Sequence, residues 1–237
     1  MAERPRLLLS DLDDTLVETR LEDYHMELRG EWAQRLGIAL PDEEYRQEVR
    51  SAMGGPGGEV IASLYPQASR WQQDRLLADF RAKAKADKEP ARPIPGARSM
   101  VKMLRQRDVR IGLLTNRSSA LDDTLRTGGL SRRHFNHVEA NVGERFGSKL
   151  PPAQRLVAKY ALKASQVVML GDSVGNDMKP FRTGLSEDEH VTLAFVPKLI
   201  LHEPDARSEM AHAQELGAFT FRTLAECGEW MDELTRV

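Results

Sequence analysis

The chain has 237 residues, of which 41% are hydrophobic and 30% charged, and its formal net charge is -2. This composition is that of an ordinary globular protein, and the length allows one large domain or two small ones. A near-neutral charge argues against a general nucleic-acid binder, and the lack of apolar runs of ~20 residues argues against a membrane span. The single cysteine, Cys227, excludes an internal disulfide and a cysteine-based zinc cluster, as expected in a reducing cytoplasm.

Three short apolar runs each end in small polar or acidic residues: LLLSDLD at 7–13, RIGLLTN at 110–116 and VVMLGDS at 167–173. Continuous apolar runs of this length are typical of parallel strands that are buried on both faces. Helical patterns precede the second and the third run, at 95–108 and 151–163. Strands that alternate with helices predict a doubly wound α/β sheet.

The segment between the first two runs is too long for a simple crossover between parallel strands. Thr15 and Arg110 lie about 95 residues apart, whereas a crossover needs only a few tens of residues. Apolar residues at helical spacing recur through this segment. We therefore predict a small helical domain at 17–92, inserted into an α/β core formed by 1–16 and 93–237.

Glycine and proline mark two breaks in the predicted helical domain. The sequence ARPIPG at 91–96 predicts the linker that returns the chain to the core. The sequence MGGPGGEV at 53–60 predicts either a loop that faces the strand ends or a plain turn between two helices.

The C-terminal part of the chain adds two further elements. VTLAFV at 191–196 predicts another strand, and TLAECGEWMDEL at 223–234 predicts a terminal helix. Thr223 and Glu226 fit a capping box at the start of this helix. Cys227 lies on the apolar stripe of the same helix, so packing explains it better than reactivity.

Polar side chains follow all three apolar runs, namely Asp11, Thr115 and Asp172. Ligands bind outside the carboxyl ends of the strands in open α/β sheets, so we expect these residues to converge on one crevice. The carboxylates of Asp11 and Asp172 are hard oxygen ligands that suit Mg²⁺. A bound divalent cation would also neutralise acids that otherwise repel one another.

Asp11 and Asp13 lie two residues apart at the end of the first strand. Alternation along a strand would place both on one side, with Leu12 directed into the core. One acid can then attack a phosphoryl group and form an aspartyl-phosphate, while the other transfers protons. The hydroxyl of Thr115 and the ammonium of Lys149 suit the charge of the phosphoryl group, so the sequence indicates phosphoryl transfer.

These residues, in this order, resemble the four motifs of the haloacid dehalogenase-like superfamily, in its phosphatase branch. The motifs are D-x-D-x-T at 11–15, a threonine after an apolar strand at Thr115, a lysine before a helix at Lys149, and G-D at 171–172 with a further acid at Asp177. One departure is Asp14, where many members have glycine. The resemblance implies a Rossmann-like core, and the inserted domain is similar to the helical cap of phosphoglycolate phosphatase-like members.

The resemblance also implies a catalytic role for several residues. Asp11 would be the nucleophile and Asp13 the general acid and base. Thr115 and Asn116 would hold the phosphoryl group, and Lys149 would balance its charge.

Mg²⁺ is the cofactor that the resemblance implies. Its ligands would be Asp11, the main-chain carbonyl of Asp13, and Asp172. Asp177 would steady the metal site from behind these ligands.

We therefore expect a Mg²⁺-dependent phosphatase that hydrolyses a phosphate monoester of a small metabolite through an aspartyl-phosphate. One alternative is a phosphotransferase or mutase, in which the hydroxyl of a sugar phosphate replaces water. The other is a non-catalytic binding module of the same fold. The intact acid pair Asp11 and Asp13 argues against a binding module.

The expected partner is a small phosphorylated molecule, with no nucleic acid and no membrane, and the expected assembly is a monomer or a homodimer. The opening residues MAERPR lack the apolar region of a signal peptide, so we expect a cytoplasmic location. Residues 198–216 receive no role.

Overall fold

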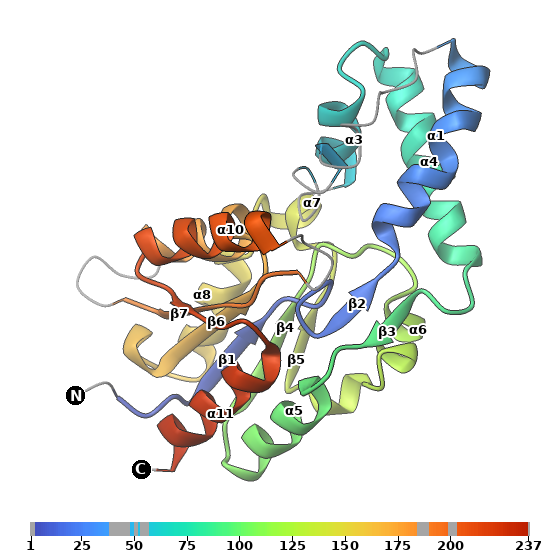
Figure 1. Ribbon diagram of the computed structural model, residues 1–237. Coiled ribbons are helices and arrows are strands. Elements are labelled where there is room, and N and C mark those ends of the chain that lie inside the picture. The colour runs from blue at the N-terminus through green and yellow to red at the C-terminus, as the bar shows by residue number, and fades with distance from the viewer. Residues whose placement is uncertain are drawn as a thin grey trace.

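The computed structural model describes residues 3–37, 48–49, 52, 57–183, 190–198 and 203–236. Within these residues a six-stranded parallel sheet has the order β5-β4-β1-β6-β7-β8 (Figure 1). Its strands are β1 (Leu7–Ser10), β4 (Arg110–Leu114), β5 (His137–Glu139), β6 (Val167–Gly171), β7 (Thr192–Phe195) and β8 (Phe219–Thr220). The predicted doubly wound sheet is confirmed, and each of the apolar runs forms a strand.

Strand β1 lies between β4 and β6, and all four of its residues are buried. Because successive side chains point to opposite faces, Leu8 belongs to one apolar cluster, whereas Leu7 and Leu9 belong to another. The continuous apolar run is therefore explained by burial on both faces of the sheet.

Helices cover both faces. The cluster around Leu8 contains residues of α5 (Ala97–Gln106), α6 (Leu121–Thr127) and α11 (Leu224–Thr235). The opposite cluster contains residues of α8 (Leu150–Lys159), α9 (Lys179–Thr183) and α10 (Glu203–Glu215). The short helices are α7 (Val142–Phe146), the 3₁₀ turns η1 (Arg132–His134) and η2 (Ala164–Gln166), and the π-helix η3 (Val174–Met178).

The terminal helix α11 begins at the predicted cap. The Thr223 hydroxyl accepts a hydrogen bond of 3.2 Å from the Glu226 amide, while the Glu226 carboxylate accepts from the Arg222 amide at 2.9 Å. The reciprocal bond of the predicted capping box thus shifts by one residue. Cys227 is fully buried, and burial raises the pKa of its thiol to about 12, which is consistent with a packing role.

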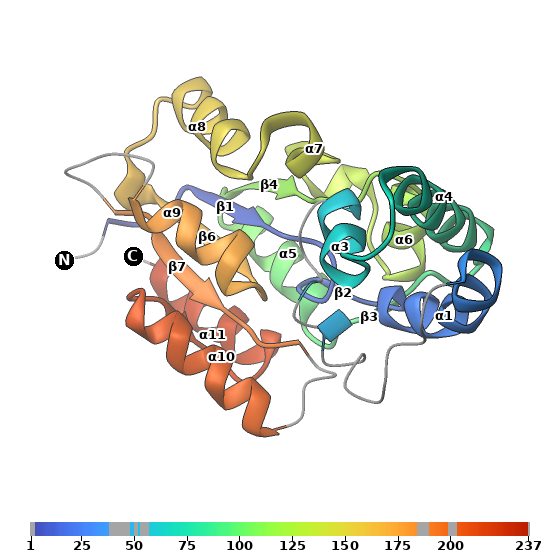
Figure 2. The same cartoon turned by 90° about the horizontal axis from the view of Figure 1, so that it is seen from above.

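The described part of the inserted segment includes three helices that share an apolar cluster. These are α1 (Leu21–Leu36), α3 (Gly57–Leu64) and α4 (Arg70–Ala86). Helices α1 and α4 lie side by side in both views (Figures 1 and 2). Trp32 and Leu76 are at most 1% exposed and pack with Ile61 of α3 in this cluster. Part of the predicted MGGPGGEV loop, 53–56, lies outside the described residues, and the rest begins α3.

A two-stranded ribbon joins the helices to the sheet. Strand β2 (Val17–Thr19) pairs antiparallel with β3 (Ala91–Pro93), so the chain leaves the core and returns to it at adjacent positions. The segment predicted as a linker is thus partly a strand. Among the described residues, no helix is both long and apolar enough to cross a bilayer.

Replacing Gly128 by alanine is expected to destabilise this ribbon. A Cβ at position 128, just after α6, would lie 2.2 Å from Cγ1 of Val17, which is fully buried in β2. Overpacking of this kind destabilises by about 1–3 kcal/mol, measurable as the free energy of unfolding in denaturant. The matched control is Gly30→Ala in α1, where a Cβ meets nothing within 4 Å, so a gain of up to about 1 kcal/mol is expected. Equal effects at the two positions would contradict the packing argument.

Candidate active site

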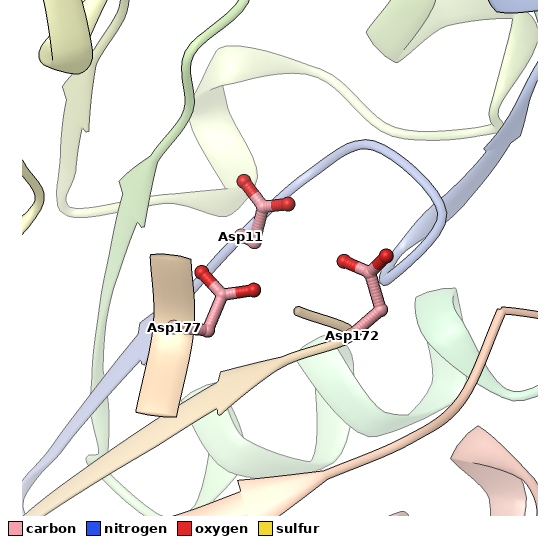
Figure 3. Close-up of side chains that lie close together, drawn as sticks. All are labelled: Asp11, Asp172 and Asp177. Carbon is pink, nitrogen blue, oxygen red and sulfur yellow. The ribbon is translucent and has the colours of Figure 1, made fainter. Parts of the chain in front are cut away.

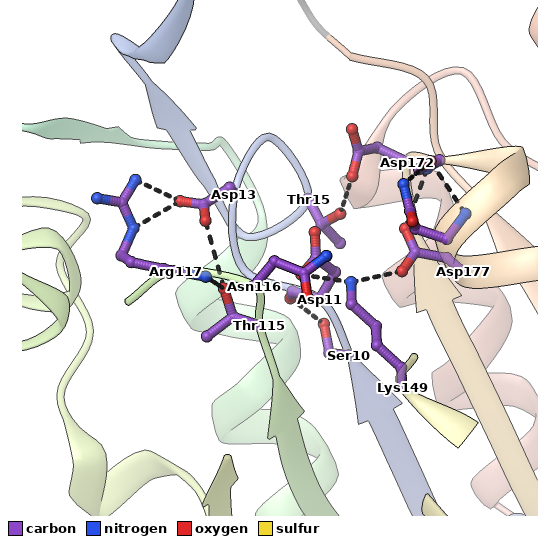
Figure 4. A network of polar contacts seen from close by, with 12 residues as sticks. Ser10, Asp11, Asp13, Thr15, Thr115, Asn116, Arg117, Lys149, Asp172 and Asp177 are labelled. Atoms are coloured by element: carbon purple, nitrogen blue, oxygen red, sulfur yellow. Dashed lines mark hydrogen bonds and ion pairs between the residues drawn. The ribbon is translucent and has the colours of Figure 1, made fainter. Parts of the chain in front are cut away.

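The carboxyl ends of three adjacent strands bring the predicted residues together (Figure 4). Asp11 follows β1, Thr115 follows β4 and Asp172 follows β6. Lys149 reaches the same place from the start of α8, and Asp177 reaches it from η3. The parallel arrangement of the strands explains why these distant segments meet.

Three buried carboxylates form the centre of the site (Figure 3). One oxygen from each of Asp11, Asp172 and Asp177 lies within 4.8 Å of the others. The Asp177 carboxylate occupies the place where a Cβ at Gly171 would stand, since such an atom would be 2.2 Å from Asp177 Cγ. The glycine of the G-D motif therefore makes room for the third acid.

Lys149 lies between two of these acids. Its Nζ is 2.7 Å from Asp11 Oδ1 and 2.6 Å from Asp177 Oδ1, and the side chain is 3% exposed. Burial disfavours the charge of the lysine, but the two aspartates prevail and raise its pKa above the ordinary value. Lys149 therefore stays protonated, and it fixes one oxygen of the Asp11 carboxylate.

The same burial raises the pKa values of two of the acids. The pKa of Asp11 rises well above its ordinary value because the carboxyl is buried, with repulsion from Asp177 and Asp172 adding to the effect against the attraction of Lys149. Burial likewise raises the pKa of Asp172 to about 7, although Lys198 opposes the shift. Burial is the largest cause in both cases, so the charged forms of these two carboxyls are disfavoured unless a further cation compensates them.

Asp172 and Asp177 are both held by neighbouring donors. The Thr15 hydroxyl donates to Asp172 Oδ1 at 2.8 Å, and the Ser173 amide donates to Asp177 Oδ2 at 3.0 Å. Since Lys149 contacts the other oxygen of Asp177, both oxygens of this acid have protein partners. This arrangement suits the supporting role that we predict for Asp177.

The side chain of Asp13 faces away from the three buried acids. Its Oδ1 accepts hydrogen bonds from Nε and Nη2 of Arg117 at 2.9 and 2.6 Å, and its Oδ2 accepts one from Thr115 at 3.3 Å. The Arg117 amide in turn donates to the Thr115 hydroxyl at 3.0 Å. Asp11 and Asp13 line the same pocket but belong to separate polar networks.

Asn116 lies beside this second network. Its Oδ1 accepts a hydrogen bond of 2.8 Å from the Gly143 amide at the start of α7, and the residue lines the pocket that contains Asp11 and Asp13. Asn116 therefore lies in the pocket with Asp11 and Asp13, while Thr115 contacts Asp13 and Lys149 contacts Asp11.

The sequence profile of the haloacid dehalogenase-like hydrolases matches residues 5–183. The chain belongs to this family. The match covers β1, the inserted helices and the residues from Asp11 to Asp177 that build the site. No relative among the curated proteins matches the sequence.

Solved structures of other haloacid dehalogenase-like proteins share the fold at low sequence identity. A predicted phosphatase from Clostridium acetobutylicum has a TM-score of 0.72 and 13% identity, covering 97% of this chain and 99% of that one. A predicted phosphoglycolate phosphatase from Haemophilus somnus has a TM-score of 0.70 and 14% identity, covering 97% of this chain and 99% of that one. A β-phosphoglucomutase from Clostridium difficile has a TM-score of 0.68 and 13% identity, covering 98% of this chain and 97% of that one. The described fold, inserted helices included, is thus shared with these proteins.

The departure from the motif of the hydrolase family at Asp14 has a conformational explanation. Asp14 has a φ of 60°, in the left-handed region that glycine enters most easily. Aspartate tolerates this region better than most residues, and Asp14 Oδ1 accepts hydrogen bonds from the amide and hydroxyl of Thr19 at 2.9 and 3.0 Å. Asp14 thus holds a left-handed turn of the kind that glycine adopts most easily, and it accepts two hydrogen bonds from Thr19 of β2.

Two cations of this site were missed by the sequence analysis. Arg117 is two residues beyond Thr115, and Lys198, whose Nζ lies 3.8 Å from Asp172 Oδ2, follows β7. Lys198 belongs to the segment that received no role. The rule that polar residues after a strand line the crevice applies to β7 as well, and it would have included Lys198.

Proposed function

We propose that this haloacid dehalogenase-like hydrolase is a phosphatase that removes phosphate from a small phosphorylated metabolite through an aspartyl-phosphate on Asp11. The observation that supports the proposal best is the position of Asp11. Its carboxylate lies in a pocket with Asp13 and Asn116, one of its oxygens is fixed by the buried Lys149, and Thr115 contacts the neighbouring Asp13.

The proposed reaction uses the two polar networks in turn. An oxygen of Asp11 attacks phosphorus, and Asp13 gives a proton to the leaving alcohol. Water then attacks the aspartyl-phosphate, and Asp13 takes the proton from that water, so phosphate leaves and both acids return to their starting state. Arg117 would position Asp13, because its two hydrogen bonds fix the direction of that carboxylate.

The residues present fit Mg²⁺. Carboxylate oxygens within 4.8 Å of one another are the hard ligands that this ion prefers, and the raised pKa values of Asp11 and Asp172 indicate that a positive charge there would be favourable. We propose Asp11, the main-chain carbonyl of Asp13 and Asp172 as ligands, with Asp177 in support. When bound, the ion would withdraw charge from the phosphoryl oxygens.

Mg²⁺ is expected to raise the melting temperature more at about pH 8 than at about pH 6. The pKa of Asp172 is raised from 3.8 to about 7, so without metal its contribution to stability is full at low pH and is lost as the pH rises through about 7. Below that value protons compete with the metal for Asp172. Thermal unfolding at both pH values, with and without Mg²⁺, tests this. An equal rise in melting temperature with Mg²⁺ at the two pH values, or no rise at either, would contradict the metal assignment.

We further propose that residues 17–92 act as a cap over a core of 1–16 and 93–237, in a cytoplasmic monomer or homodimer. The separate apolar cluster of α1, α3 and α4 and the single β2–β3 connection support this division. The pocket in front of Asp11 is lined by residues of α1, α3 and α4 as well as by residues of the core. The cap would therefore contact the part of the substrate that leaves as the alcohol.

Analysis of both products tests the phosphatase proposal. Purified protein with Mg²⁺ is incubated with 4-nitrophenyl phosphate and with a panel of phosphorylated metabolites, and phosphate and alcohol are measured together. We expect equal amounts of the two products and no release after addition of EDTA. A mutase would instead yield an isomeric phosphate ester and little free phosphate. Unchanged release in EDTA would refute the metal-dependent mechanism.

A further inference from the structure

The pocket in front of Asp11 has two unlike walls. One wall belongs to the α/β core and carries the acids Asp11, Asp13 and Asp172. The other belongs to the inserted helices, and the partly open pocket between the two walls has a volume of about 110 Å³. This volume is of the order of the ~150 Å³ apolar cavity that holds a benzene molecule in an engineered protein. The space therefore fits a compact leaving group.

The wall formed by the helices is apolar. Leu21 of α1, Val60 and Ile61 of α3, and Leu77, Phe80 and Ala84 of α4 line it. Surfaces of this kind gain free energy by covering apolar atoms, at about 25 cal/mol per Å², and offer nothing to the hydroxyl groups of a polyol. Along this wall a leaving group rich in hydroxyls would lose hydrogen bonds to water, and only His25 and Arg81 carry polar side-chain atoms that could replace them.

Two polar side chains interrupt this apolar wall, Arg81 of α4 and His25 of α1. The ring of His25 is 1% exposed and lies against Phe80, with ring centroids 4.3 Å apart. Its Nδ1 has no hydrogen-bond partner among the described residues, and buried polar atoms of this kind are rare. Burial lowers the pKa of His25 to about 4, so the ring is neutral near pH 7. A ligand with one suitable group would satisfy the unpaired nitrogen.

The cations of the pocket already have acid partners. In the part of the chain that the structure describes, Arg117 binds Asp13, and Lys198 lies 3.8 Å from Asp172. The third, Arg81 of α4, forms an ion pair with Glu144 of α7. A second phosphate or a carboxylate on the substrate would have to break one of these pairs before it gained a counter-charge.

We propose that the leaving group of the substrate is a compact, mainly apolar alcohol that carries no charge of its own and has one group that hydrogen-bonds to His25. This inference rests on the proposed phosphatase function and specifies its substrate class. It disfavours phosphorylated sugars, polyols and carboxylic acids.

A panel of four phosphate monoesters tests the substrate class. Benzyl phosphate and 3-hydroxybenzyl phosphate represent the proposed class, glycerol 3-phosphate represents polyols, and phosphoglycolate represents carboxylates. With Mg²⁺ present we expect kcat/KM at least about 10-fold higher for both benzyl esters than for the other two. Binding of the same esters to Asp11→Asn, measured by calorimetry, is expected to follow the same order, because binding does not require the nucleophile.

Two substitutions probe the wall itself. His25→Phe keeps an aromatic ring but removes the unpaired nitrogen, so kcat/KM for 3-hydroxybenzyl phosphate is expected to fall about 2- to 10-fold further than kcat/KM for benzyl phosphate. Leu77→Gln is expected to reduce the preference for benzyl phosphate over glycerol 3-phosphate. Its control is Ala78→Gln, which introduces the same polar side chain at the exposed neighbouring position of α4, outside the pocket lining, and should leave the preference unchanged.

The outcomes separate this inference from the function on which it rests. Phosphate release that favours glycerol 3-phosphate or phosphoglycolate would overturn the substrate class and leave the phosphatase intact. Release from none of the esters, or release that persists in Asp11→Asn, would overturn the proposed function itself. If a wall variant fails to fold, as judged by its melting curve, the order of the four esters on the unaltered protein still decides.

Discussion

Asp11→Asn is expected to reduce phosphate release by about 10⁴- to 10⁶-fold, the range that loss of an enzymic nucleophile produces. Asparagine keeps the shape of the side chain, and its amide oxygen can still contact Lys149, but the amide is a poor nucleophile. Phosphate released from 4-nitrophenyl phosphate under saturating Mg²⁺ gives the rate. The wild-type protein should also take up label from a ³²P-phosphorylated substrate, and the variant should not.

A matched substitution separates loss of chemistry from loss of charge. Asp122 lies in the exposed first turn of α6, outside the residues that line the pocket. Asp122→Asn removes the same charge and should retain the full rate and the melting temperature. Substantial turnover by Asp11→Asn, or an equal loss of rate in both variants, would contradict the assignment of Asp11 as nucleophile.

Asp13→Asn is expected to lower kcat by about 10²- to 10⁴-fold, the usual contribution of a general acid and base. Asp13 contacts Arg117 and Thr115, whereas the three-acid cluster lies apart from its side chain. The stabilisation by Mg²⁺ should therefore survive the substitution. Steady-state rates and the rise in melting temperature with Mg²⁺, both measured on one preparation, test the two statements.

The neighbouring acid provides the control for this substitution. Asp14→Asn makes the same change one residue away, and asparagine also tolerates the left-handed conformation at this position. Its amide oxygen can accept the two bonds from Thr19, so we expect a rate within about 10-fold of wild type. Loss of the Mg²⁺ effect in Asp13→Asn would show instead that this side chain belongs to the metal site.

The sequence was sufficient for the sheet and for the place where its acids meet. Asp11, Thr115 and Asp172 end apolar runs, and parallel strands end at one edge, so their proximity follows from topology without any detail of packing. The start of α11 could also be predicted from the sequence, because Thr223 caps the helix through a hydrogen bond with the amide of Glu226, three residues away. Local geometry and strand direction are both encoded over short distances.

Other parts of the site depend on contacts that no short segment encodes. Arg117 and Asp13 are 104 positions apart, and their pairing depends on how two loops meet after the sheet has formed. His25 received no role in the sequence analysis. Only the packing of α1 against α4, which forms one wall of the pocket, buries the Nδ1 of His25 without a hydrogen-bond partner.

The β2–β3 ribbon bears on how such a protein can diversify. Thr19 and Ala91 are paired in the antiparallel β2–β3 ribbon, so the segment between them begins and ends at neighbouring positions of the fold. We expect that other helices can replace this segment without altering the pairing register of β1, β4 and β6. If the inserted helices act as the proposed cap, a chimaera joined at Thr19 and Ala91 is expected to change substrate recognition while preserving the chemistry of the core.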